Sequence, residues 1–179
     1  MRILVLLFSF VFISCKSTFK VVDRKDIVLD SVGIRAIFPT IDGVWFGGTN
    51  SKAGFVSFQN DSDTKIVKLQ KEITDFRSMS NSNNGILFLN AGTPANIYAM
   101  STFGYSCASS LMYSESGEKV FYDSMFIDIK TGFGIIIGDP TEDCLSILLT
   151  ENSGKTWNKI PCANLPKTAD GEAAFAASD

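Results

Sequence analysis

Histidine is absent from the 179 residues, which removes the side chain that most often serves as general base, metal ligand or pH switch near neutrality. Lysine and arginine, 16 in all, are dispersed along the chain, and the net charge is −3 with a pI of about 5.0. Nucleic acid is therefore not an expected partner, because its phosphates require a concentrated basic surface. The sequence also lacks a G-x-G-x-x-G loop, a C-x-x-C pair and a haem-attachment motif, so we expect no cofactor.

Long hydrophobic runs are also scarce, and the longest stands at the N-terminus, where Met1 and Arg2 are followed by the apolar residues 3–13. Eleven apolar residues are too few to cross a bilayer as a helix, but they match the hydrophobic region of a secretory signal. We therefore expect residues 1–14 to be a signal peptide and the rest of the chain to be exported.

The apolar run ends in the residues FISC, which resemble the lipobox of bacterial lipoproteins. In such proteins the cysteine becomes the lipidated first residue of the mature chain. The resemblance implies a lipid anchor on Cys15, a linker over residues 15–26, and attachment to a membrane of the cell envelope at its periplasmic or surface face. Phe12 stands where lipoboxes most often have leucine. An ordinary signal peptide with an incidental cysteine is the alternative interpretation.

Beyond residue 26, short alternating or apolar runs are separated by Gly, Asn, Asp and Pro, and helical periodicity is weak throughout. This pattern predicts β-strands joined by turns. The strands expected, in order, are 33–38, 43–48, 53–59, 64–70, 75–80, 85–91, 96–102, 107–113, 123–129, 132–138, 144–150 and 156–160.

These strands fall into three sets of four, and the second strand of each set opens on a glycine, at Gly43, Gly85 and Gly132. A β-propeller blade typically has four strands in about 40 to 50 residues. We therefore expect an all-β fold, a β-propeller of four-stranded antiparallel blades. Residues 27–179 would form a partial propeller of about three blades and one strand. The expected bounds are 33–70, 75–113 and 123–160 for the blades and 171–179 for the start of a fourth.

Residues 150–157 read TENSGKTW and resemble the Asp box, S/T-x-D/N-x-G-x-T-W, of the bacterial-neuraminidase-repeat (BNR) propellers. The Asn152 side chain can fold back onto nearby backbone amides, and Gly154 can adopt a positive φ at no steric cost. Trp157 can then pack its large apolar ring under the turn. We expect Thr150, Asn152, Gly154 and Trp157 to stabilise a hairpin between the third and fourth strands of a blade, and to carry no chemistry.

The same hairpin predicts a disulfide bond, which export would permit. If the turn is centred near residue 153, Cys144 and Cys162 lie opposite each other on neighbouring antiparallel strands. Directly opposed residues of a non-hydrogen-bonded pair have Cα atoms about 4.5 Å apart, which is close enough for a bridge. We therefore expect a Cys144–Cys162 bond with Cys107 left free. Two buried thiols are the alternative.

Several stretches together resemble the photosystem II stability/assembly-factor-like β-propellers, in the bacterial envelope form of that family. The most telling are VFYDSMFID (120–128), GIIIGDPTEDCLSILLTENSGKTW (134–157) and LPKTADGEAAFAAS (165–178), with IRAI (34–37) and FRSM (76–79) in addition. The resemblance runs from about residue 27 to the C-terminus. It implies a closed propeller of about seven blades in a complete member, so this chain is expected to be a partial sequence. Some members are described as oxidoreductase-like, but no redox motif is visible here.

Innermost propeller strands line the central channel, which makes four charged residues at their starts candidates for binding. Arg35 and Arg77 occupy equivalent places in the first two sets of strands, and Asp75 and Asp123 occupy equivalent starts of the second and third sets. One hypothesis is a charged axial or top surface that binds a protein or an anionic ligand through arginine contacts. The alternative is Arg–Asp salt bridging between neighbouring blades.

A further candidate is Asp139, in the acidic loop GDPTED (138–143). With Glu142 and Asp143 it offers oxygen ligands for a cation. The loop matches no metal motif well, so a solvated turn is the favoured interpretation and no metal site is predicted.

Two classes of function compete. The first is a non-catalytic, membrane-tethered propeller that acts as a binding or assembly-factor-like scaffold. The second is a sialidase-like glycan hydrolase, which the Asp box suggests. Sialidases need three arginines for the substrate carboxylate, a tyrosine nucleophile paired with a glutamate, and an aspartate. Beyond the signal the chain has only Arg24, Arg35 and Arg77, and Arg24 precedes the first blade. The sequence therefore favours a protein that is not an enzyme.

Overall fold

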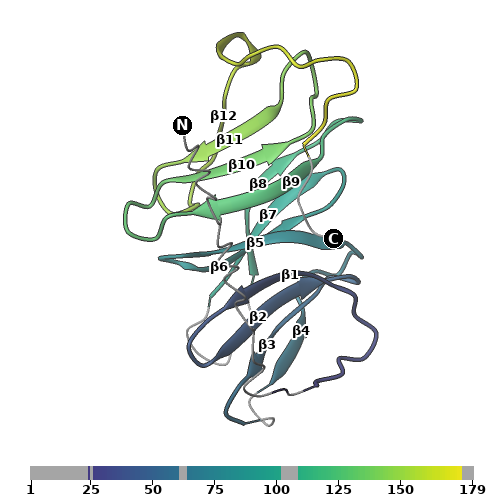
Figure 1. The fold of residues 1–179 in the computed structure, drawn as a ribbon, viewed down its shortest axis with the longest axis vertical. Coiled ribbons are helices and arrows are strands. Elements are labelled where there is room, and N and C mark those ends of the chain that lie inside the picture. The colour runs from purple at the N-terminus through teal and green to yellow at the C-terminus, as the bar shows by residue number, and fades with distance from the viewer. Residues whose placement is uncertain (1–23, 25, 61–63, 102–108, 175–179) are drawn as a thin grey trace, which may run out of the picture.

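The computed structural model of the protein describes residues 24, 26–60, 64–101 and 109–174. The expected signal peptide, Cys15 and Cys107 lie outside these residues. The described chain is all-β, with twelve strands in three four-stranded antiparallel sheets, each in sequential order (Figure 1).

Sheet A contains β1 (Ile34–Pro39), β2 (Gly43–Gly48), β3 (Lys52–Ser57) and β4 (Lys65–Lys68). Sheet B contains β5 (Phe76–Ser82), β6 (Gly85–Asn90), β7 (Ala95–Met100) and β8 (Ser109–Glu115). Sheet C contains β9 (Tyr122–Ile127), β10 (Gly134–Gly138), β11 (Ser146–Thr150) and β12 (Asn158–Lys159).

The predicted all-β fold and the three sets of four strands are therefore confirmed, with shifted ends. Strand β10 begins at Gly134, because Gly132 lies in the preceding turn with φ +74°. Strand β12 covers only Asn158 and Lys159, followed by a 3₁₀-helix at Cys162–Asn164. The expected start of a further strand at 171–179 is not present in its described part, because residues 171–174 form a turn and a loop.

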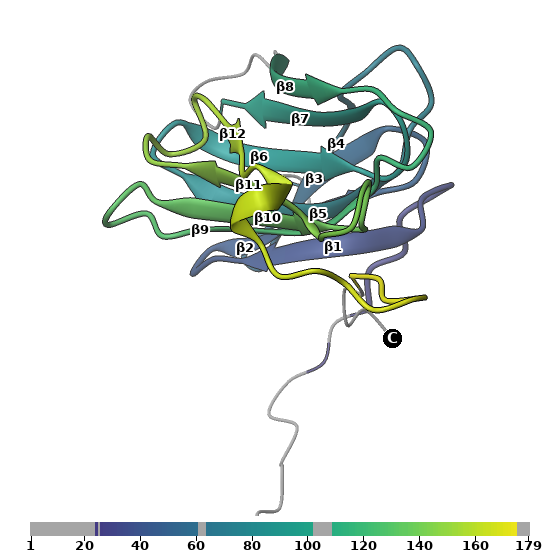
Figure 2. The same cartoon turned by 90° about the horizontal axis from the view of Figure 1, so that it is seen from above.

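The three sheets are stacked with their first strands adjacent, since β1 contacts β5 and β5 contacts β9 (Figure 2). Between sheets A and B the core contains Phe76 and Phe88, whose ring centroids are 5.3 Å apart, together with Tyr98. Between sheets B and C a second core gathers aliphatic side chains around Tyr122 and Trp157. Each sheet therefore buries a face against the next, which supplies the apolar burial that an isolated sheet lacks.

A β-bulge recurs at the same point of each first strand. The pairing of β1 with β2, of β5 with β6 and of β9 with β10 skips one residue, which is Arg35, Arg77 and Asp123 respectively. Arg35 and Arg77 are thus equivalent. Asp123 corresponds to them and not to Asp75, which precedes β5 by one residue, so the expected equivalence of the two aspartates is wrong. The bulge adds a residue that a simple alternating pattern does not count.

Hydroxyl groups of β5 connect sheet B to sheet C. The backbone N–H groups of Met125 and Ile127 on β9 donate to the Oγ atoms of Ser78 and Ser80, each at 3.0 Å. Because β9 pairs with β10 on its other side, these bonds satisfy N–H groups that face away from its own sheet.

Candidate functional site

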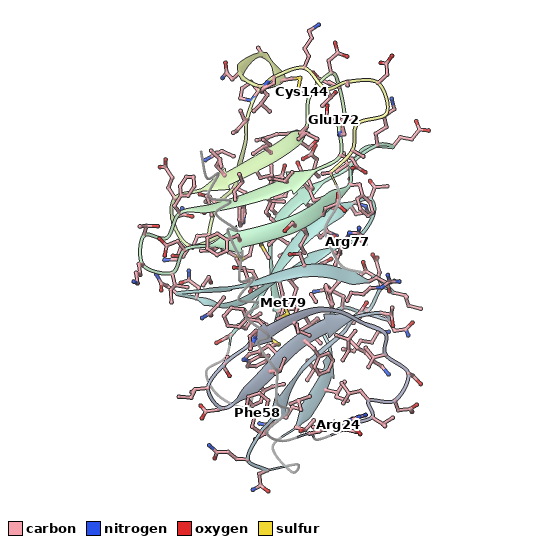
Figure 3. The ribbon with its side chains drawn as sticks, viewed as in Figure 1. Arg24, Phe58, Arg77, Met79, Cys144 and Glu172 are labelled. Carbon is pink, nitrogen blue, oxygen red and sulfur yellow. A yellow bond between two sulfur atoms is a disulfide. The ribbon has the colours of Figure 1, made fainter. Side chains whose placement is uncertain are left out.

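Among the five predicted binding residues, the described structure brings only Arg77 and Asp123 into contact. Figure 3 labels Arg77 among the side chains of the sheets. Arg77 Nε lies 2.9 Å from Asp123 Oδ1, and the guanidinium also lies 5.2 Å from the centre of the Phe121 ring. The Asp123 side chain is 4% exposed and that of Arg77 27% exposed. This pair therefore joins sheets B and C in the manner of the salt-bridge alternative, and the Arg77 guanidinium is already occupied.

The other three predicted residues lie apart from this pair. Arg35 is exposed and makes no hydrogen bond or ion pair with the described residues. Asp75 Oδ1 accepts a hydrogen bond from the Asn50 N–H at 3.2 Å, and Asp139 Oδ1 accepts one from the Ala174 N–H at 2.9 Å. The two aspartates thus hold loops, while Arg35 presents its charge to solvent.

The Asp-box residues form a hydrogen-bonded turn between β11 and β12. Asn152 Oδ1 accepts hydrogen bonds from the Thr150 hydroxyl at 3.0 Å and the Thr156 N–H at 2.9 Å. The Thr150 Oγ1 in turn accepts from the Gly154 N–H at 3.0 Å. Gly154 has φ +81°, a conformation that disfavours side-chain-bearing residues. Trp157 is 7% exposed and packs in the core between sheets B and C.

The same turn contacts sheet B, which gives it a role in packing. Asn83, at the β5–β6 turn, donates its side-chain amide to Ser153 Oγ at 3.1 Å, and the Asn84 amide lies 3.5 Å from the Ser153 carbonyl. A Cβ on Gly154 would come within 2.3 Å of a Leu87 methyl group on β6. These contacts hold the Asp-box turn against sheet B.

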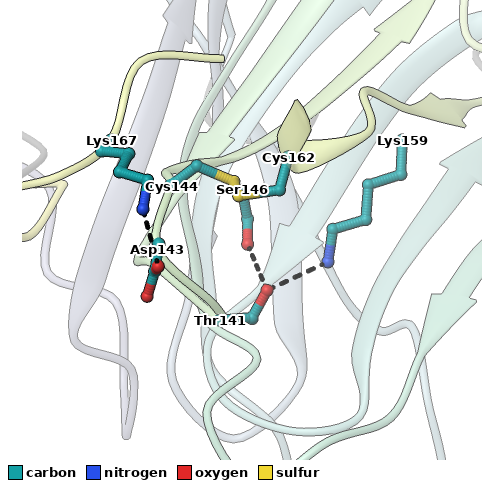
Figure 4. The surroundings of a disulfide bond; sticks show 7 residues. All are labelled: Thr141, Asp143, Cys144, Ser146, Lys159, Cys162 and Lys167. Atoms are coloured by element: carbon teal, nitrogen blue, oxygen red, sulfur yellow. Dashed lines mark hydrogen bonds and ion pairs between the residues drawn. A yellow bond between two sulfur atoms is a disulfide. The ribbon is translucent and has the colours of Figure 1, made fainter. Parts of the chain in front are cut away.

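A disulfide bond joins Cys144 and Cys162, the pair expected from the hairpin (Figure 4). Their Cα atoms are 5.6 Å apart. The predicted directly opposed strand pair is wrong, however. The β11–β12 register pairs Leu148 with Lys159, one residue away from the expected register, and both cysteines lie outside the strands. The bond therefore anchors the 3₁₀-helix to the loop before β11.

The acidic loop after β10 does not gather ligands for a metal ion. The Asp143 carboxylate lies 3.5 Å from Lys167 Nζ, and both side chains are well exposed (Figure 4). Nowhere in the described residues do three or more acidic or cysteine side chains come together as a metal site would require.

A cluster that the sequence did not predict centres on Glu115, at the end of β8. Its Oε2 accepts hydrogen bonds from the hydroxyls of Tyr113 and Tyr122, each at 2.7 Å, and its Oε1 accepts one from Lys159 Nζ at 2.5 Å. Tyr122 and Lys159 belong to sheet C, so this carboxylate connects sheet B to sheet C. One signal was available, because Tyr113 and Glu115 are two apart and share a face of one strand.

Partial burial and the hydrogen bonds within this cluster shift the pKa values of three of its members. Burial alone would raise the pKa of Glu115, but hydrogen bonds from Lys159, Tyr113 and Tyr122 outweigh it and lower that pKa. Burial, reinforced by the Glu115 carboxylate, raises the pKa of both tyrosines. Tyr122 is completely buried, so its hydroxyl does not face an open site, and the cluster joins two packed sheets.

A cavity of about 1110 Å³ lies against sheet B on the side of sheet A. One wall is the segment 69–75 that returns from β4 to β5, which we call the return segment, and the other walls are the β6–β7 loop and β8. Its polar lining residues include Glu72, Asp75, Asn96 and Tyr98. We call this cavity the AB cleft.

The outer face of sheet A carries a second, apolar hollow of about 490 Å³. Ile34, Ile37 and Phe58 line it and are each about half exposed or more, while Phe46 at its base is buried. This face is apolar, like the faces that pack between the sheets, but nothing in the described residues covers it fully.

Within the described residues no helix is both long enough and apolar enough to cross a membrane. No protein-family model, no curated protein and no solved structure matches this chain.

Proposed function

We propose that the protein is a non-catalytic, assembly-factor-like binding scaffold of the bacterial cell envelope. Its three sheets are consecutive blades of a β-propeller, and a lipid on Cys15 tethers it to the membrane. It binds a protein or an anionic ligand on the side of the molecule where the first strands of the sheets lie, through the exposed guanidinium of Arg35.

The repeated geometry of the sheets supports the propeller part of this proposal. Each sheet has four strands in sequential order, and the first strands of successive sheets are neighbours. The bulge at residues 35, 77 and 123 recurs in all three first strands. The exposed apolar face of sheet A is also what a blade in contact with a further blade would present.

The observation that carries the binding part is the contrast between Arg35 and Arg77. The two residues occupy the same bulge position, but Arg77 is held by Asp123 whereas Arg35 is exposed and has no partner in the described chain. An exposed guanidinium can form paired hydrogen bonds with a carboxylate or phosphate. Because Arg35 contributes nothing visible to the packing of the sheets, an external acidic group is its best candidate partner.

A sialidase-like activity is less well supported by the same residues. Arg24 pairs with Asp26 at 3.0 Å on the surface, and Arg77 pairs with Asp123 between two sheets, so no arginine triad gathers. The chain does contain a tyrosine–glutamate pair, Tyr122 and Glu115. Tyr122 is completely buried, however, and a nucleophile must reach its substrate.

The anchor is tested by metabolic labelling with a clickable palmitate analogue in cells that express the full chain. Wild-type protein should incorporate the label and partition with membranes, whereas Cys15→Ala should do neither. The variant Cys107→Ser serves as the matched control and should behave as wild type. Equal labelling of Cys15→Ala and wild type would refute the anchor.

The binding role is tested by placing a photo-crosslinking amino acid at position 34, which is half exposed and next to Arg35, so that the guanidinium of Arg35 is kept. A discrete crosslinked species should form there, and should be absent when the same amino acid replaces Asp42, which is also exposed but lies in the β1–β2 turn. Equal crosslinking at both positions would contradict the Arg35 site. Turnover of a fluorogenic sialoside by purified wild-type protein would contradict the non-catalytic role.

A further inference from the structure

We propose that the AB cleft binds a basic peptide segment and seats a lysine or arginine side chain against Glu72 and Asp75. This site is separate from Arg35 and has the opposite charge preference. It adds a second class of partner to the proposed function. It rests on that function only in its assumption that the protein is a binding module.

The walls of the cleft are held in place by hydrogen bonds from both sheets. Ser51 of sheet A accepts the Thr74 N–H at 2.9 Å, and its own N–H donates to the Thr74 carbonyl at 2.6 Å. Asn90 of sheet B donates its amide to Thr74 Oγ1 at 3.1 Å. At the other end of the return segment, Gln70 donates to Ser109 Oγ at 2.9 Å. A cleft that is already formed loses little conformational entropy when a ligand binds.

The polar groups of the cleft are mainly acceptors. The Glu72 side chain is exposed and forms no hydrogen bond with the described residues. Asp75 uses only Oδ1, for the Asn50 N–H, which leaves its second oxygen available. The Tyr98 hydroxyl is the exception: it accepts from the Asn96 amide at 2.9 Å, and its own proton can be donated to a carbonyl of a bound peptide. A ligand rich in donors, such as an ammonium or guanidinium group, therefore fits this lining best.

The electrostatic balance points the same way. Two carboxylates, Glu72 and Asp75, line the cleft, against one cation, Lys71. Burial is the main reason why the pKa of Tyr98 is raised, and the charge of Glu72 raises it further. A negative field inside a partly enclosed cleft attracts cationic groups more strongly than the same charges on an open surface.

Size and apolar content indicate a peptide segment as the source of the cation. A cavity of about 1110 Å³ exceeds what a metal ion or a single amine would fill. Exposed apolar side chains also line it, Ile73 at 76% and Leu111 at 57% exposure. Aliphatic stems of lysine and arginine cover such surface while their charged heads reach carboxylates.

On the other face of sheet B the Glu115 cluster links β8 to sheet C, whereas here β8 borders an open cleft.

The test is fluorescence anisotropy with the full chain and a short fluorescein-labelled Gly/Ser peptide that carries two lysines. Matched peptides carry glutamate or norleucine in place of the lysines. Wild type should bind the lysine peptide only. Glu72→Gln and Asp75→Asn should each weaken binding about tenfold, since in each the acceptor of the ammonium group loses its negative charge. Both variants keep an oxygen acceptor, so they should melt at the wild-type temperature.

Asp42→Asn is the control, because it makes the same change of charge in the β1–β2 turn, away from the cleft lining. It should bind the lysine peptide as wild type does. The inference is overturned if wild type does not prefer the lysine peptide, or if Asp42→Asn weakens binding as much as Glu72→Gln does. Failure here together with specific crosslinking at position 34 would remove the cleft and leave the proposed function in place.

Discussion

Arg77 and Asp123 occupy the same bulge position in consecutive first strands, and their side chains meet at 2.9 Å between sheets B and C. Equivalent positions of neighbouring repeats thus carry opposite charges that bind each other. Because the Asp123 carboxylate is almost completely buried, the pair is shielded from solvent and salt far better than a surface ion pair.

Removal of this contact should weaken the packing of sheet C on sheet B. We expect Arg77→Ala to lower the free energy of unfolding by about 3 kcal/mol, as is usual when one partner of a buried pair is removed. A double-mutant cycle with Asp123→Ala should give a coupling energy of about 2 kcal/mol. Urea denaturation followed by tryptophan fluorescence measures both quantities.

Arg35→Ala is the matched control, because Arg35 stands at the equivalent bulge but contacts no described partner. Its effect should stay within about 0.5 kcal/mol, as for most surface substitutions. Equal losses for Arg35→Ala and Arg77→Ala would show that the ion pair does not contribute.

The Glu115 cluster predicts how stability depends on pH. The pKa of Glu115 is lowered on folding from its ordinary value of 4.5, so its contribution is present above pH 4.5 and is lost as the pH falls through the folded-state pKa. The pKa values of Tyr113 and Tyr122 are raised from 10.0, so their contribution is present below pH 10.0 and is lost as the pH rises through the folded-state values.

The free energy of unfolding should therefore fall as the pH drops below 4.5 and again as it rises above 10.0. Glu115→Gln should remove part of the decline at acid pH, and Tyr122→Phe should remove part of the decline at alkaline pH. An unchanged acid profile in Glu115→Gln would contradict the assignment. Asp42→Asn serves as a control, because it replaces an exposed carboxylate outside the cluster.

The Asp-box turn depends on the side chain of Asn152. Asn152→Ala should destabilise the protein by about 1–2 kcal/mol, because it removes the acceptor of the Thr150 hydroxyl and the Thr156 N–H. Asn152→Asp keeps that acceptor and should cost less. Asn158→Ala, at an exposed position of β12, is the control and should be nearly neutral. Thermal melts of the three variants rank these effects, and a neutral Asn152→Ala would contradict the role given to this side chain.

The Cys144–Cys162 bond closes a short loop, with a sequence separation of 18 residues. Loop-closure entropy for a loop of this length corresponds to about 3 kcal/mol, so a Cys144→Ser/Cys162→Ser double variant should unfold at a clearly lower urea concentration. Reduction of the wild type should lower its midpoint similarly. Thiol titration of the unfolded protein before and after reduction provides the direct check, because reduction should release two additional thiols.

Much of the fold could be predicted because strand periodicity is a local property. Runs such as GVWFGG, at residues 43–48, show it without any knowledge of their neighbours. Strand β12 was predicted too long, because the Asp-box turn takes Thr156 into its hydrogen bonds and Trp157 into the core between sheets. The disulfide pair could be chosen from the hairpin, but its register was misplaced by one residue for the same reason.

The contacts between sheets were harder to predict. An Arg–Asp salt bridge between blades was one of the two alternatives predicted. Because the bulge residues were not counted, however, Asp123 was aligned with Asp75 instead of with Arg77. Glu115 and Lys159 are 44 residues apart and on different sheets, so no local pattern connects them. Glu72 and Tyr98 likewise come to the same cleft only when the return segment packs against sheet B.

The hydroxyls of Ser78 and Ser80 have a consequence for the solution behaviour of the protein. An open edge strand offers N–H groups to which a strand of another molecule can add, which is a common start of aggregation. On β9 the N–H groups of Met125 and Ile127 are already engaged by these serines. The β9 edge of sheet C is therefore a poor template for fibril growth while sheet B stays in place.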